Sequence, residues 1–201
     1  NNPWTPLFAA DPEQSINYLT AHDNLTLMDK ITKMNASGEY AKRLQSYGNG
    51  IILVSQGIPF IHAGAEFGRS KNMDHNSYKT AGDINNIKWG LKKSNNDIFK
   101  YYQGMIAMRK AHPAFRFTTK RDIEANVKTS GYNGAVVVDI NGAAAGDSWK
   151  QIKLVINSGN NLTIGGVDGW KKKVNGVTVN TDGTDGNATA EGTAVTVWYK
   201  E

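Results

Sequence analysis

The dipeptide His22-Asp23 places an imidazole beside a carboxylate, directly after the apolar segment 16–20. That segment predicts a β-strand, and a strand that ends in His-Asp presents both groups at one rim of a sheet or barrel. A carboxylate can stabilise positive charge that develops on a substrate, and a neutral imidazole can bind hydroxyl groups. The structural alternative is that Asp23 caps a helix around residues 25–28. The dipeptide alone leaves both interpretations open.

The elements that would position this pair alternate between strand and helix before residue 115, which favours parallel βα units. The expected elements, in chain order, are a strand at 16–20, a helix at 39–55, a short buried strand at 58–62 and a helix at 97–111. The first helix has an apolar stripe formed by Tyr40, Leu44, Tyr47, Ile51 and Val54. Gly57 and Pro59 end this helix, and Pro113 ends the second one. Because active sites follow the carboxyl ends of parallel strands, His22 and the polar loop 64–96 are suitably placed.

The pattern changes near residue 115 to short alternating strands that are joined by Gly, Asn and Asp turns. The expected strands are 135–140, 151–156, 170–179 and 193–199. Hairpin signals stand at Asn141-Gly142, Asn175-Gly176 and Asp182-Gly183. The composition of residues 180–192 predicts a flexible loop. This half of the chain therefore predicts a small antiparallel β-sandwich.

Four segments, in this order and spacing, resemble the closing part of the catalytic domain of type I pullulanases, α-1,6-glucan debranching enzymes of the α-amylase superfamily. The segments are AHDN at 21–24, LTLMDKI at 25–31, QGIPFIHAG at 56–64 and DHNSYK at 74–79. The resemblance is specific over residues 16–115 and weaker beyond them. It implies a C-terminal fragment of mixed class, α/β followed by all-β. The last two βα units of a (β/α)8 barrel would occupy 1–114, and a small antiparallel β-sandwich would occupy 115–201.

The resemblance implies that the parent protein hydrolyses α-1,6 branch points in pullulan, starch or glycogen with retention of configuration. It assigns Asp23 as a transition-state stabiliser and His22 as a hydroxyl-binding residue where the bond breaks. A further carboxylate, Glu66, is expected either to pair with Arg69 or to contact substrate. Retention also needs a nucleophile and a general acid about 5 Å apart. Family members carry both on earlier strands, and no carboxylate pair of this sequence has the matching context, so we expect the isolated chain to be inactive.

The segment 74–79 matches the family's loop that borders the substrate cleft, which makes Asn76 and Tyr78 the expected substrate-binding residues. Amide and aromatic groups supply the directional hydrogen bonds and the flat apolar face that sugar recognition requires. The alternative is ordinary turn chemistry, because Asp74, Asn76 and Ser77 are typical turn residues.

The tryptophans of the chain raise a second function from a different class. Trp149, Trp170 and Trp198 would form a sugar platform if the chain were a carbohydrate-binding or docking module based on the sandwich. Tryptophans so far apart in strands more often pack in a core, and Trp89 is likewise expected to pack rather than to bind. A third hypothesis is a heteromeric enzyme whose other chain supplies the early strands.

Composition excludes several classes of function. The chain contains no cysteine, which excludes disulfides and thiol nucleophiles, and its four histidines have no ligand spacing, so we expect no metal and no cofactor. The net charge is +5, but the basic residues are scattered, so we expect no nucleic-acid partner. The longest apolar run, near Ile51, is too short for a membrane span, so no membrane partner is expected. Residues 182–187 only faintly resemble a calcium loop, because the terminal glutamate is lacking.

The expected partners are an α-glucan substrate and either the absent N-terminal part of the barrel or a second copy of this chain. Two βα units would expose strand edges and apolar helix faces. We therefore expect the isolated chain to dimerise, to swap segments or to rearrange over residues 1–60. The lack of cysteine fits a secreted or cell-surface bacterial protein and is also compatible with a cytoplasmic one, so localisation stays undetermined.

Overall fold

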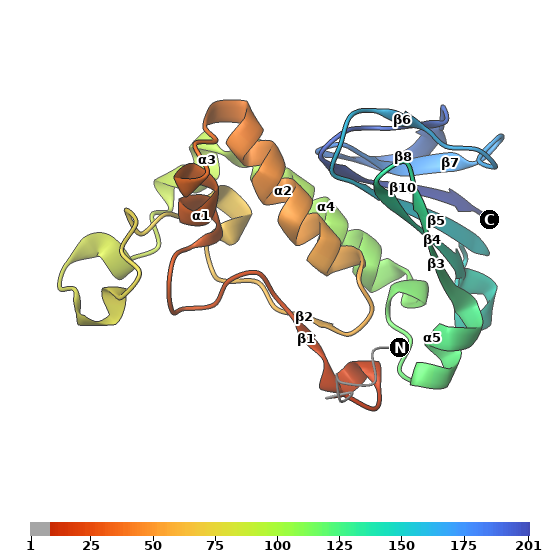
Figure 1. Ribbon diagram of the computed structural model, residues 1–201, viewed down its shortest axis with the longest axis horizontal. Coiled ribbons are helices and arrows are strands. Elements are labelled where there is room, and N and C mark those ends of the chain that lie inside the picture. The colour runs from red at the N-terminus through yellow and green to blue at the C-terminus, as the bar shows by residue number, and fades with distance from the viewer. Residues whose placement is uncertain (1–8) are drawn as a thin grey trace.

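The computed structural model describes residues 9–201, and for residues 181, 182, 184 and 185 it describes the backbone only. A helical region is followed by a region dominated by an antiparallel sheet (Figure 1). The fold is therefore a mixture of helices and antiparallel sheet. Among the described residues, no helix combines the length and the apolar character that crossing a bilayer requires.

The helical region is built around two long helices that lie side by side (Figure 1). The helices of the chain are α1 (Leu27–Lys33), α2 (Gly38–Val54), α3 (Gly90–Ser94), α4 (Asn96–Ala111) and α5 (Lys120–Asn126). The predictions of α2 and α4 are confirmed, with ends within one residue of those expected. Local signals account for these ends, because Gly57 has a φ of 90° and neither Pro59 nor Pro113 can continue a helix.

The buried face of α2 contains four members of the expected apolar stripe, Leu44, Tyr47, Ile51 and Val54, and is wider than that stripe. Tyr40 is 55% exposed, whereas Gln45 and Asn49 are buried. Their amides have partners on other segments. Gln45 Nε2 donates to the carbonyl oxygen of Ala65 at 2.7 Å, and Asn49 Nδ2 donates to the hydroxyl of Tyr102. The helix buries polar side chains because α4 and the loop around residue 65 supply hydrogen-bond partners.

The strands β1 (Ile16–Asn17) and β2 (Ile58–Pro59) pair in parallel, with Ile16 opposite Ile58. Both are shorter than the expected strands at 16–20 and 58–62. In the described part of the chain, each strand has hydrogen bonds to one neighbouring strand only. Without a second neighbour, fewer of its residues are held in a strand conformation.

Arg109 of α4 holds the turn that leads from α2 into β2. Its guanidinium is 5% exposed and donates to the carbonyl oxygens of Leu53, Ser55 and Gly57 at 2.7 to 3.0 Å. Burial lowers the pKa of Arg109 to about 10, so the group keeps its charge at neutral pH. Carbonyl groups at the end of α2 are thereby satisfied, and the start of β2 is fixed relative to α4.

A six-stranded antiparallel sheet with the order β3-β4-β5-β10-β7-β8 forms the second region. Its strands are β3 (Val127–Tyr132), β4 (Ala135–Asn141), β5 (Gln151–Asn157), β7 (Lys171–Asn175), β8 (Thr178–Asp185) and β10 (Ala194–Lys200). A separate pair joins β6 (Leu162–Thr163) to β9 (Thr189–Ala190). The expected strands at 135–140, 151–156 and 193–199 are confirmed, whereas β3 and α5 were not predicted.

The hairpin signals of the sequence are right at one position of three. The signal at Asn175-Gly176 falls on the β7–β8 hairpin, whose two turn residues are Gly176 and Val177, so the expected strand at 170–179 is two strands. Asn141-Gly142 instead begins a 3₁₀ turn, and Asp182-Gly183 lies within β8, inside the segment that was expected to be a flexible loop. The β3–β4 hairpin turns at Asn133-Gly134, whose φ values of 46° and 82° suit a two-residue hairpin turn.

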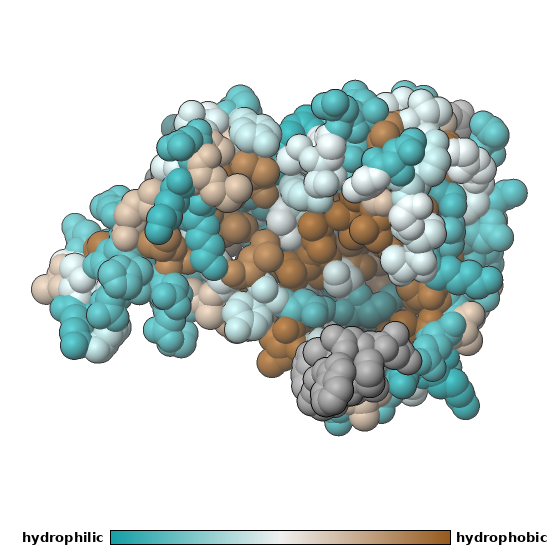
Figure 2. Space-filling view, in the orientation of Figure 1, coloured by the Kyte–Doolittle hydropathy of each residue, from teal (hydrophilic) through white to brown (hydrophobic). Residues whose placement is uncertain are grey.

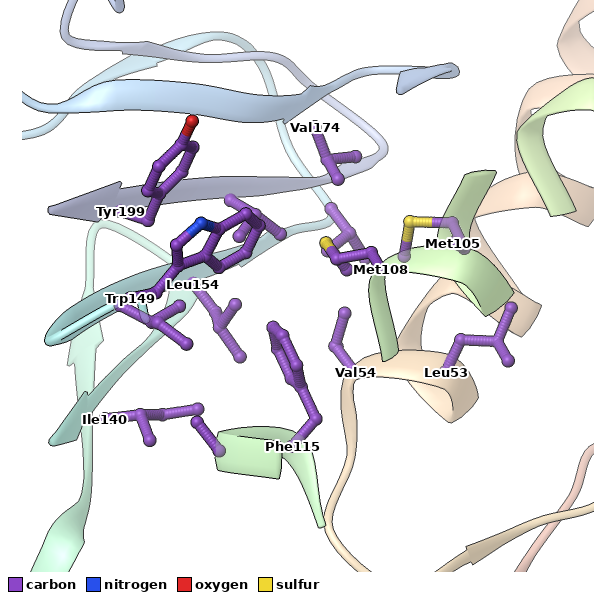
Figure 3. Packing of buried hydrophobic residues seen from close by; sticks show 14 of the residues in the cluster. Leu53, Val54, Met105, Met108, Phe115, Ile140, Trp149, Leu154, Val174 and Tyr199 are labelled. Atoms are coloured by element: carbon purple, nitrogen blue, oxygen red, sulfur yellow. The ribbon is translucent and has the colours of Figure 1, made fainter. Parts of the chain in front are cut away.

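One hydrophobic cluster contains side chains from both regions (Figure 3). Its helical members include Leu53, Val54, Met105 and Met108, and its sheet members include Ile140, Leu154, Val174 and Tyr199. In Figure 3 the side chains of Val54 and Met108 lie next to those of the sheet, so the two regions are packed together through a shared core. The boundary between residues 114 and 115 stays a prediction.

Candidate functional site

His22 and Asp23 lie in the loop between β1 and α1, and both side chains face solvent. They are 85% and 71% exposed, and His22 Nε2 lies 3.5 Å from Asp23 Oδ1. The residue that caps α1 is Thr26, whose Oγ1 accepts a hydrogen bond from the backbone N–H of Asp29 at 3.1 Å. The alternative in which Asp23 caps a helix at 25–28 is therefore wrong.

A cavity of about 130 Å³ opens beside these two residues. Its lining consists of His22, Asp23, Lys71, His75, Asn76, Ser77, Tyr78 and Asn85. The structure thus brings the four residues singled out from the sequence, His22, Asp23, Asn76 and Tyr78, to one place. The second pair comes from the long loop between β2 and α3, which projects away from the sheet region (Figure 1). The roles of the four residues stay predictions.

The segment around Asp74 combines turn chemistry with exposed binding groups. Asp74 Oδ1 accepts a hydrogen bond from the backbone N–H of Asn76 at 2.8 Å, and its Oδ2 accepts one from the hydroxyl of Thr80 at 2.7 Å. Hydrogen bonds from Thr80 and Asn76 lower the pKa of Asp74 below its ordinary value. Asp74 therefore shapes the turn. The side chains of Asn76 and Tyr78 line the cavity, and Tyr78 is 71% exposed.

Lys71 is a buried charged residue in the cavity wall. It is 4% exposed, and its Nζ donates to the backbone carbonyl of His22 at 2.8 Å and to Ser77 Oγ at 2.9 Å. Burial and the charge of Arg69 lower the pKa of Lys71, whereas nearby carboxylates, Asp23 first among them, act in the opposite direction. The loop that carries His22 is thus attached to the loop that follows β2.

Further hydrogen bonds extend the connection between the two loops, through Asp29 and through the pair Ser77 and Asn85. Asp29, 2% exposed, accepts hydrogen bonds from Ser70 Oγ and from the backbone N–H of Lys71. Burial alone would raise the pKa of Asp29, but hydrogen bonds from Ser70 and Lys71 help to bring it below its ordinary value. Ser77 Oγ donates to Asn85 Oδ1 at 2.8 Å, and Asn85 Nδ2 donates back to the Ser77 carbonyl at 2.7 Å. The His22 loop, the first turn of α1 and the long loop between β2 and α3 therefore share one hydrogen-bond network.

Four residues of the cavity wall received no role from the sequence: Lys71, His75, Ser77 and Asn85. Two of them, His75 and Ser77, stand inside the segment 74–79 that carries the family resemblance, which is the signal that could have found them. A lysine or serine in a polar loop gives no indication that it will be buried. Lys71 is buried against residues far away in the chain, since it donates to the carbonyl of His22 and to Asp29, whereas the partners of Ser77 lie within eight residues of it.

Glu66 and Arg69 do not form the expected ion pair. Glu66 Oε2 accepts a hydrogen bond from the backbone N–H of Gly64 at 2.9 Å, and Arg69 Nη1 donates to the Ala63 carbonyl at 3.1 Å. Gly64 has a φ of 91°, and a Cβ at this position would lie 2.7 Å from Arg69 Cδ. The arginine packs over this turn and binds backbone carbonyls instead of the glutamate. Burial and the charge of Arg69 lower the pKa of the neighbouring His62.

The tryptophans of the sheet region mostly belong to its core. Trp149 and Trp198 are 5% and 0% exposed, which confirms the prediction that they pack. Trp149 is stacked between His112 and Tyr199, with ring centroids 3.4 and 4.0 Å away. Trp89, also expected to pack, leans on one neighbouring ring at 6.0 Å but is 68% exposed, because only one of its faces is covered.

The charges of the cavity limit its chemistry. Among the described residues that line it, Asp23 is the only carboxylic acid. In the described part of the chain, no three His, Cys, Asp or Glu side chains gather in a way that could hold a metal ion. The arrangement can bind hydroxyl groups through imidazole and amide groups, and it can stabilise positive charge through one carboxylate.

Comparison with known proteins finds that this chain is similar to parts of pullulanases, although no protein-family model matches it. A curated pullulanase of Bacillus subtilis is 39% identical over 120 residues, which are 59% of this chain and 17% of that protein. A pullulanase structure from Bacillus acidopullulyticus has a TM-score of 0.86 at 28% identity, over 95% of this chain and 25% of that one. The type I pullulanase of Bacillus subtilis complexed with maltose has a TM-score of 0.85 at 27% identity, over 94% and 28%. The chain spans less than a third of each protein.

Proposed function

Over the part that it spans, this chain is related to the type I pullulanases, and on that premise we propose that it is part of a retaining glycoside hydrolase. The substrate bonds would be α-1,6-glucosidic branch points in pullulan, starch or glycogen. The observation that carries the proposal is the cavity at which His22, Asp23, Asn76 and Tyr78 meet. The maltose in the Bacillus subtilis relative supports an α-glucan as substrate.

Each of the four residues has a role that suits its chemistry. Asp23 would stabilise the positive charge that develops on the sugar ring as the glycosidic bond breaks. His22, 85% exposed beside it, would bind ring hydroxyls through its imidazole nitrogens. Asn76 would hydrogen-bond further hydroxyls, and the exposed ring of Tyr78 would stack on the apolar face of a pyranose.

We propose that this chain alone does not complete the reaction. A retaining mechanism needs a nucleophile and a general acid about 5 Å apart. The cavity wall offers Asp23 as its single carboxylic acid among the described residues, which leaves those two roles to groups elsewhere in the whole enzyme.

We also propose that 115–201 form a β-sandwich and that the described part of the predicted first region, residues 9–114, is the last two βα units of a (β/α)8 barrel; residues 1–8 of that prediction lie outside the described residues. The parallel pairing of β1 and β2, with helices between them in the chain, supports the βα interpretation. The position of His22 in the loop that follows the parallel strand β1 suits the rim where barrel active sites lie. The antiparallel order of the large sheet supports a separate β region.

The exposed face of β1 and β2 supports the barrel interpretation as well. Ile16, Tyr18, Ile58 and Phe60 are 45 to 58% exposed, and Figure 2 shows apolar surface gathered over α2 and near the two strands. Parallel sheets are normally covered on both faces. Two larger hollows, of about 680 and 900 Å³, lie beside β2 and α4, and Ile61 belongs to both. We propose that the rest of the barrel, or in its absence a second copy of this chain, covers this surface.

In the alternative function, a carbohydrate-binding module on the sandwich, three tryptophans would bind sugar, but two of them are inaccessible to a ligand. Trp149 and Trp198 are buried and stack on other side chains, so no sugar ring can reach their faces. Trp170, half-buried, would be left as a single contact. This alternative is therefore the weaker of the two.

A segment exchange tests the proposed function. This chain replaces the matching part of the Bacillus subtilis pullulanase, and reducing-sugar release from pullulan is measured for the exchange protein and for its Asp23→Asn variant. We expect the exchange protein to hydrolyse pullulan and Asp23→Asn to lower kcat at least about 100-fold, the scale of one lost electrostatic group. The matched control is Asp139→Asn, a half-exposed carboxylate of the large sheet.

Two results would contradict the proposal. Full activity in a folded Asp23→Asn exchange protein would remove Asp23 from the reaction. Release of sugar by this chain alone, lost on Asp23→Asn, would show that the chain holds a carboxylate pair of its own.

A further inference from the structure

The side chains of His22 and Asp23 pack little against the rest of the protein and so do little to hold their loop in place. Both side chains are more than two thirds exposed, and α1 starts only after the separate cap at Thr26. A site that acts on one glycosidic bond needs its groups held in position, because a displacement of about 1 Å can cost on the order of 100-fold in rate. Some contact from outside the loop must therefore fix it.

We propose that Lys71 is the positioning residue that holds the His22–Asp23 loop in its binding geometry, an inference that rests on the proposed glucan site. Its Nζ donates to the backbone carbonyl of His22 at 2.8 Å, so the contact acts on the main chain and leaves the imidazole and the carboxylate available to substrate. Lys71 would not touch substrate itself, because it is 4% exposed.

The charge of Lys71 is what suits it to this task. An ammonium group buried at 4% exposure is costly unless its donors are used. Two of its donors have partners, the His22 carbonyl and Ser77 Oγ, and nearby carboxylates, Asp23 and Asp74 among them, favour the charged form. Charge-assisted hydrogen bonds of this kind are stronger than neutral ones. A residue that served packing alone would be apolar.

Lys71 also connects the two halves of the cavity wall. Through Ser77 Oγ it reaches the loop that presents Asn76 and Tyr78, because Ser77 follows one of these residues and precedes the other. Its backbone N–H donates to Asp29 Oδ2 at 2.9 Å, which attaches the first turn of α1 to the same point. One side chain therefore sets the distance between the hydroxyl-binding groups of both loops.

The chain offers a matched control in Lys172. This lysine of β7 is also 4% exposed, and its Nζ donates to Asn187 Oδ1 and to the Thr189 carbonyl, each at 2.7 Å. It belongs to the sheet region and lines no part of the cavity. Lys172→Met therefore also removes a buried ammonium group that has two hydrogen-bond partners, but at a place where no glucan site is proposed.

The test compares Lys71→Met, Lys71→Arg and Lys172→Met with the wild-type chain by nuclear magnetic resonance. One measurement is the backbone order parameter of residues 21–25, and the other is the shift of His22 and Tyr78 signals on titration with maltotetraose. We expect Lys71→Met to lower the order parameters from about 0.85 to below about 0.6 and to weaken maltotetraose binding at least tenfold. Lys71→Arg should restore most of both values, and Lys172→Met should change neither.

Unchanged order parameters and unchanged sugar binding in a folded Lys71→Met variant would overturn the inference and leave the proposed function intact. Equal changes in Lys71→Met and Lys172→Met would also overturn it, because they would indicate general destabilisation. If the wild type shows no response to maltotetraose, the proposed glucan site fails, and the order parameters alone decide whether Lys71 positions the loop. Should Lys71→Met not fold, Lys71→Gln takes its place, with loosening of residues 21–25 expected and its absence contradicting the inference.

Discussion

β10, near the centre of the large sheet, buries six of its seven residues, whereas neither β1 nor β2 buries any. β10 is flanked by β5 and β7 and faces the two long helices, so the sheet region completes its core with residues of this chain. The parallel pair has exposed apolar residues at a position where sheets are normally covered. The sheet region buries its apolar residues within this chain, whereas the helical region leaves apolar residues of β1 and β2 exposed. The proposed site lies on the helical region.

The largest expected loss of folding stability comes from a substitution in the core of the sheet region. Trp198→Ala removes a side chain that is 0% exposed and leaves a cavity, so the free energy of unfolding should fall by about 4 kcal/mol in urea denaturation. Phe60→Ala, at a residue 46% exposed beside β2, should change it by less than about 1 kcal/mol. Equal losses at both positions would mean that the parallel pair is as well packed as the sheet.

A somewhat smaller effect should follow from breaking the polar link between the regions. Asp147 is 1% exposed and lies 2.7 Å from His112 Nδ1, and it accepts hydrogen bonds from the backbone N–H groups of Ala114 and Trp149. Asp147→Ala leaves these donors buried and unpaired, so we expect a loss of about 3 kcal/mol in thermal or urea unfolding.

Asp139→Ala is the control for this link, because its carboxylate is 48% exposed and pairs with Lys153 near the surface. Its loss should stay below about 1 kcal/mol. A comparable loss in both variants would contradict a special role for Asp147.

The exposed face of the parallel pair predicts self-association. Sedimentation velocity of the isolated chain should show a dimer or larger species, and the double substitution Ile16→Ser, Ile58→Ser should weaken association about tenfold, because two apolar side chains leave the contact. The control is Val177→Ser, at an apolar residue 40% exposed in the β7–β8 turn. A wild-type chain that stays monomeric at high concentration would contradict the proposal that a second copy of the chain packs against the exposed apolar face of β1 and β2.

The smallest expected effect is a pH dependence that belongs to the helical region. Burial and the charge of Arg69 lower the pKa of His62 below 6.5, so below pH 6.5 the unfolded chain takes up a proton that the folded chain does not. Stability is therefore full above 6.5 and falls as the pH drops toward the pKa of the folded state. His62→Gln should flatten this slope between pH 6.5 and 5, and the effect should be under about 1 kcal/mol because His62 is only partly buried. An unchanged slope in His62→Gln would assign the dependence to other groups.

Elements whose ends depend on neighbouring residues could be predicted from the amino-acid sequence. The ends of α2 and α4 follow from Gly57, Pro59 and Pro113, which act on the backbone of their own segment. The turn at Asn175-Gly176 follows from the left-handed backbone that glycine tolerates. The motif segments also named His22, Asp23, Asn76 and Tyr78, which the structure brings to one cavity.

Only the tertiary structure decided which polar groups are buried and what they bind. Gln45 and Asn49 are buried beside the apolar stripe of α2 because partners on distant segments accept the hydrogen bonds of their amide N–H groups. Arg69 binds carbonyl groups in place of Glu66 because the turn at Gly64 brings it over the backbone. Lys71 is buried because two loops close around it. A polar side chain enters a protein interior only where its hydrogen bonds are replaced, and that condition depends on residues that the local sequence does not contain.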